Sequence, residues 1–126
     1  MIRAASLTET LLELLTAPRA GGVLALADEL VNYCLGHQVS LTITTGNCVV
    51  VDAHNQQKEV VPITLSKVMF RALIARFAAL CSSAKTMTPY GGTGQIELPD
   101  HSLILKVALK NTIDHQWLEL VPTRID

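Results

Sequence analysis

The chain has 126 residues, of which 49% are apolar and 17% are charged, and its formal net charge is −1. This is enough material for one globular domain with a substantial core, and it excludes a highly charged, disordered chain. Ten basic residues stand against eleven acidic ones. Because nucleic-acid-binding proteins carry a positive excess, we expect no binding to nucleic acid.

The first predicted element is a short amphipathic helix within residues 1–20. Ser6 and Glu9 form a capping box ahead of leucines at helical spacing. Leu12 lies about 100° around the helix from the leucine before it, so the leucines cover more of the surface than one packing stripe requires. We therefore expect Leu12 and Leu15 to contact a second copy in a homo-oligomer. The alternative is that this helix folds back over its own sheet.

Residues 21–126 are predicted to form a single α+β domain. Apolar residues at three- and four-residue spacing predict one helix over 23–35, and a second begins after Ser66 and continues to Cys81. The segment 86–94 is predicted to be a loop because it holds Pro89 and three glycines. Period-two alternation predicts strands at 39–44, 48–51, 59–63, 95–98, 103–110 and 116–121.

This order, with short turns, indicates a mainly antiparallel sheet of five or six strands packed against helices. The periodicity also predicts which side chains form the core. They are Leu11, Leu30, Val31, Leu41, Ile43, Val50, Phe70, Leu73, Ile74, Phe77, Leu105, Val107 and Leu118.

The sequence lacks the patterns of common catalytic and metal sites. Its four histidines fall in or beside predicted turns, and none has a partner at metal-ligand spacing. Asp100, His101 and Ser102 are adjacent on a predicted tight turn, so their side chains point apart and cannot form a catalytic relay. We therefore expect no catalytic residue, no metal and no cofactor.

The glycine-rich segment is the one stretch that is similar to an anion-binding loop. Tyr90, Gly91 and Gly92 lie at its centre, and glycines let backbone N–H groups approach a phosphate. The alternative is the entry of a hairpin, in which the glycines supply positive φ angles.

The three cysteines, Cys34, Cys48 and Cys81, lie in apolar surroundings and form no CxxC pattern. They are predicted to be buried free thiols, which favours a cytoplasmic location. No apolar run reaches the roughly 18 residues of a membrane span, and the start of the chain lacks a signal sequence, so membrane insertion is not expected.

The stretch from 24 to 122 resembles the PAS-like domain that precedes the motor in type II secretion and type IV pilus ATPases. The resemblance lies in a helix before a hydrophobic strand, a hairpin, a helix carrying Leu73-Ile74-Ala75-Arg76-Phe77, and a turn at Pro89-Tyr90-Gly91-Gly92-Thr93. Arginines of that domain reach the nucleotide held by the motor. Arg76 is the one retained here, and Thr93 and Lys106 occupy the other aligned positions.

The resemblance implies a PAS-like fold without the motor domain, and candidate binding residues at Arg76, Tyr90, Gly91, Gly92 and Lys106. The chain contains neither a Walker A nor a Walker B segment, so ATP hydrolysis through that machinery is excluded. We expect a non-catalytic adaptor or assembly module whose partner is itself or a secretion or pilus ATPase. The alternative is a small-ligand sensor or carrier with an apolar pocket lined by Phe70, Phe77 and Trp117.

Overall fold

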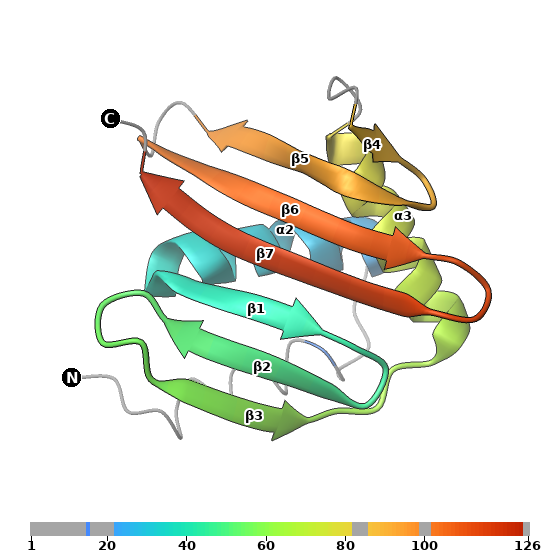
Figure 1. The fold of residues 1–126 in the computed structure, drawn as a ribbon, viewed down its shortest axis with the longest axis horizontal. Helices are drawn as coiled ribbons and strands as arrows, with labels where there is room; N and C mark the ends of the chain where they lie inside the picture. Colours follow the sequence, from blue (N-terminus) through green and yellow to red (C-terminus); the bar gives the residue numbers. More distant parts are fainter. Residues whose placement is uncertain (1–14, 16–21, 82–85, 99–101, 125–126) are drawn as a thin grey trace.

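The computed structural model describes residue 15 and residues 22–81, 86–98 and 102–124. Within these residues, two helices of 16 and 14 residues lie behind one antiparallel sheet of seven strands (Figure 1). The helices are α2 (Gly22–His37) and α3 (Lys67–Leu80). The strands are β1 (Val39–Ile43), β2 (Asn47–Asp52), β3 (Lys58–Pro62), β4 (Met87–Thr88), β5 (Gly91–Leu98), β6 (Leu103–Asn111) and β7 (Gln116–Arg124).

The strand order across the sheet is β3-β2-β1-β7-β6-β5-β4. The join between β1 and β7 brings the two halves of the chain together, with Leu41 opposite Leu120 and Ile43 opposite Leu118. All strand pairs are antiparallel, and the sheet is not closed, so β3 and β4 stand at its two edges (Figure 1). The α+β class and the sheet packed on helices are confirmed.

The core lies between the sheet and the two helices. Alternate residues of the central strands point to the helices, which we call the helix face, and the others point to the front face seen in Figure 1. Every predicted core residue that the structure describes is buried, including Phe70 and Phe77, which are 0% exposed. The remaining one, Leu11, lies outside the described residues.

A local signal in the sequence explains where α3 begins. The Ser66 hydroxyl accepts a hydrogen bond from the Met69 N–H at 3.1 Å, as expected of an N-cap. The helix is tied to β6 by two hydrogen bonds, because Arg71 Nε donates to Asn111 Oδ1 at 3.0 Å and Asn111 Nδ2 donates to the Arg71 carbonyl at 3.2 Å. These bonds satisfy the polar groups of a buried asparagine.

The expectation of a loop over 86–94 and of five or six strands is wrong. Met87 and Thr88 form β4, and they pair with Gly92 and Gly91, so β5 begins four residues earlier than Gln95. Glycines weaken the strand signal because they have no side chain to pack. Here they join the sheet because the short turn at Pro89 and Tyr90 folds β4 back onto β5.

Candidate functional site

The outer edge of β5 is covered by another strand for only part of its length. β4 pairs with Gly91 and Gly92, and Thr86 extends this contact by one residue. The Thr93 N–H donates to the Thr86 carbonyl at 3.1 Å, and the Thr86 hydroxyl donates to the Thr93 carbonyl at 2.6 Å. Beyond Thr93, no strand among the described residues pairs with this edge (Figure 1).

This part of the β5 edge, which no described residue covers, presents a defined set of backbone groups. Successive residues of a strand direct their N–H and C=O groups to opposite sides. Because Thr93 bonds outward to Thr86, Gln95 and Glu97 also direct theirs outward, whereas Gly94 and Ile96 bond to β6. No described residue bonds to the backbone groups of Gln95 and Glu97, so within the described part of the chain these two donors and two acceptors lack a partner, as on the edge strand of a sheet.

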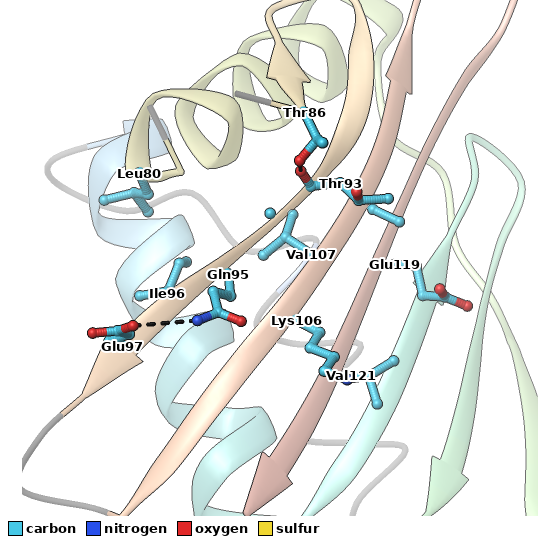
Figure 2. Close-up of a pocket in the computed structure, with 12 residues that line it drawn as sticks. Leu80, Thr86, Thr93, Gln95, Ile96, Glu97, Lys106, Val107, Glu119 and Val121 are labelled. Carbon is cyan, nitrogen blue, oxygen red and sulfur yellow. Dashed lines mark hydrogen bonds between the residues drawn. The ribbon is translucent and has the colours of Figure 1, made fainter. Parts of the chain in front are cut away.

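A hollow of about 840 Å³ surrounds this edge and reaches both faces of the sheet. Figure 2 shows Leu80 and Ile96 on the helix side of β5, and Gln95 and Lys106 on the front face. The full lining is Leu80, Thr86, Thr93, Gly94, Gln95, Ile96, Glu97, Lys106, Val107, Ala108, Glu119 and Val121.

The front-face side of the hollow carries charges of both signs. Lys106 lies directly opposite Gln95 in the register of β5 and β6, and Glu119 lies on β7 opposite Ala108. The Gln95 side-chain amide donates to the Glu97 carboxylate at 3.2 Å (Figure 2). These groups can bind a polar, extended chain through hydrogen bonds and charge pairs.

The structure does not bring the five candidate binding residues together. Lys106 lines the hollow. Tyr90 is 66% exposed in the β4–β5 turn, and Gly91 is paired with Lys110, four residues along β6 from Lys106. Four residues span about 13 Å of strand. Gly92 is enclosed by the backbone of β4.

Arg76 lies on α3, and its Nε is buried with no hydrogen-bond partner among the described residues. It is not among the residues that line the hollow. Of the five candidate binding residues, Lys106 is therefore the one that lines the hollow.

Leu15 has a different environment from the one expected for an interface residue. It is 3% exposed and belongs to the core cluster. Its side chain is therefore not available to a second copy in this conformation, because the chain itself covers it. Leu12 lies outside the described residues.

The apolar pocket expected between Phe70, Phe77 and Trp117 does not form. The two phenylalanines are fully buried on α3, under the helix face. Trp117 alternates with the buried residues Gln116 and Leu118, so it points to the front face and is only partly buried. The sheet separates these side chains, and they cannot line one cavity.

All three cysteines are free and buried. Burial raises the pKa of Cys48 to about 12 and also raises the pKa of Cys34 and of Cys81. A thiol held in its neutral form is a poor nucleophile and metal ligand. No group of three or more His, Cys, Asp or Glu side chains that could hold a metal occurs in the part of the chain that the structure describes.

A second, shallower groove lies on the outer surface of α3. Val68 and Ile113 are 83% and 65% exposed there, and Lys67 and Arg71 flank them.

Neither described helix α2 nor α3 is long and apolar enough to cross a membrane.

Sequence reasoning missed Gln95 and Glu97. Their residue types do not indicate an edge strand, and their unpaired backbone groups follow from the place of β5 near the sheet edge, which depends on the whole strand order.

No family model matches this chain, and a search of curated proteins finds no matching relative.

Proposed function

We propose that this chain is a non-catalytic assembly module that joins another polypeptide by adding a strand to the outer edge of β5. The observation that carries the proposal is the row of outward backbone groups on Gln95 and Glu97, which no described residue covers. Strand addition uses such groups for affinity and the neighbouring side-chain hollow for specificity.

The opposite edge of the sheet supports the proposal by contrast. The Asp52 N–H donates to the Gln57 carbonyl at 2.9 Å, and the Ile63 N–H donates to the Gly46 carbonyl at 3.2 Å. By alternation, Lys58, Val60 and Pro62 direct their backbone outward. Proline has no N–H to donate, and lysine and proline are the residues that natural sheets use to block edges.

The edge residues of β5 lack this protection. Between Thr93 and Glu97 there is neither a proline nor a lysine. One edge of the sheet is therefore blocked, and part of the other is not paired by any described residue, which is the arrangement expected of a sheet that receives one further strand.

The kinship with the PAS-like domain of secretion and pilus ATPases remains part of this proposal. The landmarks of that resemblance have counterparts in the structure, since α2 precedes β1, a hairpin joins β1 and β2, and a turn at Pro89 precedes β5. On the basis of this resemblance, such an ATPase, in the cytoplasm, is the partner to test first.

A small-ligand carrier is the second candidate, because the hollow of about 840 Å³ falls within the range of small-molecule sites. Native mass spectrometry of the freshly purified protein separates the two functions. A retained small molecule supports the carrier, and its loss in Lys106→Ala would place it in this hollow.

A display library of random decapeptides tests strand addition. Proline substitutions in this chain then remove the outward N–H groups one at a time. We expect selected peptides to bind the parent and the matched control Val60→Pro, whose proline lies on the blocked edge. Gln95→Pro and Glu97→Pro should each weaken binding by about tenfold, the effect of losing about 1.4 kcal/mol of hydrogen bonding.

Circular dichroism confirms that each variant keeps its fold. The proposal fails if no peptide is selected above background, or if the selected peptides bind Gln95→Pro and Glu97→Pro as well as they bind the parent.

A further inference from the structure

We infer that the strand received by β5 is β5 of a second copy of this chain, antiparallel to the first and related to it by a two-fold axis at Ile96. This inference rests on the proposed function and names the partner. It starts from the outward backbone groups of Gln95 and Glu97, which can meet the same groups of a second copy because antiparallel strands pair outward groups with outward groups.

The free groups select one register. Pairing Gln95 with Glu97 of the second copy satisfies all the outward groups of these two residues in both copies and makes four backbone hydrogen bonds. Pairing Gln95 with itself would place Glu97 opposite Thr93, whose backbone is already bonded to Thr86. Pairing Glu97 with itself would place two like charges side by side.

The selected register also gives complementary charge. Each Glu97 carboxylate lies beside the Gln95 amide of the second copy, on the same face of the joined sheet. Lys106 is the next residue across from that Gln95, so it stands about 10 Å from Glu97 between Cα atoms, two strand spacings away. Long side chains bridge this separation, and symmetry repeats the pair.

Apolar contact accompanies the hydrogen bonds on the helix face. Ile96 and Leu80 are partly buried and pack against the core. On the axis, Ile96 meets Ile96 of the second copy as a non-hydrogen-bonded pair, with Cα atoms about 4.5 Å apart and side chains in contact. The hollow that surrounds the edge of one copy is thus filled by the edge of the other.

The blocked edge explains why this association ends at two copies. In a dimer joined through β5, the edges left exposed in each copy are β3, which carries Lys58 and Pro62, and β4, which is only two residues long. Lysine, proline and very short strands all hinder pairing at a sheet edge. Isologous pairing of one edge closes the assembly, whereas two free edges would extend it into a filament.

The test is sedimentation equilibrium of the parent and matched variants over a range of protein concentrations. We expect a reversible dimer for the parent and for Val60→Pro, and about tenfold weaker dimerisation for Gln95→Pro. A charge swap adds a readout that fold stability alone would not produce. Glu97→Lys and Lys106→Glu should each weaken the dimer, and the double variant should recover most of the loss.

The register has its own test, because Ile96→Cys places two thiols at a Cα separation that a disulfide can span. Mild oxidation should give a covalent dimer of Ile96→Cys and none of Val60→Cys. A monomeric parent, a dimer that Gln95→Pro leaves unchanged, or no cross-link at position 96 overturns the inference. If the parent is monomeric but binds library peptides through β5, strand addition stands and self-pairing fails, whereas a monomer that binds no peptide defeats both.

Discussion

Gly92 controls the outer end of the sheet through its backbone geometry. Its φ of +137° is one that residues with a side chain rarely adopt. A Cβ at this position would also overlap the Thr86 carbonyl oxygen and lie 3.0 Å from the Met87 Cα. The absence of a side chain at Gly92 therefore lets β4 lie against β5. Beyond β4 and Thr86, no strand among the described residues pairs with the edge of β5.

Replacing Gly92 tests this dependence. We expect Gly92→Ala to lower the free energy of unfolding by about 1–3 kcal/mol, because the strained φ and the overlap with β4 add to one another. Gly91→Ala is the matched control, since its Cβ would meet the Leu109 carbonyl oxygen at an ordinary 3.6 Å and its φ is not positive. Urea unfolding monitored by circular dichroism measures both changes. Equal losses in the two variants would show that β4 does not depend on Gly92.

Among the elements, α3 has its stability concentrated on one face. Phe70, Leu73, Ile74 and Phe77 are 0% exposed against the sheet. The opposite face carries Val68, which is 83% exposed. The helix is held by packing of its buried stripe and by the Ser66 cap, since a helix of this length is marginal alone.

Two substitutions on α3 test this asymmetry. Phe77→Ala should lower the free energy of unfolding by about 3–5 kcal/mol, because it removes a fully buried ring and leaves a cavity. Val68→Ala, on the exposed face of the same helix, should change it by no more than about 0.5 kcal/mol. Denaturant titration gives both values. A loss below about 1 kcal/mol for Phe77→Ala would mean that the packing of this face is loose.

The contrast between α3 and β5 shows what the sequence can predict. Apolar residues of α3 repeat every three to four positions, and this local pattern predicted both the helix and its buried face. The glycines that open β5 hide its first residues, because their place in the sheet depends on β4 and β6. The candidate site could not be predicted from the local sequence, because the outward backbone groups of Gln95 and Glu97 can be identified only once the strand order is known.

For the whole molecule, the sheet has two unlike edges and one shared core. The core crosses the join between β1 and β7, so the two halves of the chain are expected to unfold together. Cys34 on α2, Cys48 on β2 and Cys81 after α3 are buried in this core. Its stability is therefore linked to the ionisation of thiols that are widely separated in the sequence.

That linkage makes the stability of the fold depend on pH. In the unfolded chain a thiol ionises near pH 8.5, whereas burial raises the pKa of Cys48 to about 12 in the folded protein. Above about pH 8.5 the unfolded state thus binds fewer protons than the folded state, and stability falls as the pH rises. Between about pH 8 and 10, Cys48 alone should lower the free energy of unfolding by about 2 kcal/mol.

Cys48→Ala isolates this contribution, because every other titrating group is common to the two proteins. The substitution leaves a small cavity, which lowers stability by a similar amount at both pH values and cancels when the pH dependence is compared. Urea unfolding at the two pH values should therefore show a drop that is about 2 kcal/mol smaller in Cys48→Ala than in the parent. Equal drops would mean that the Cys48 thiol ionises as readily in the folded protein as in the unfolded chain, and that the core around it admits water.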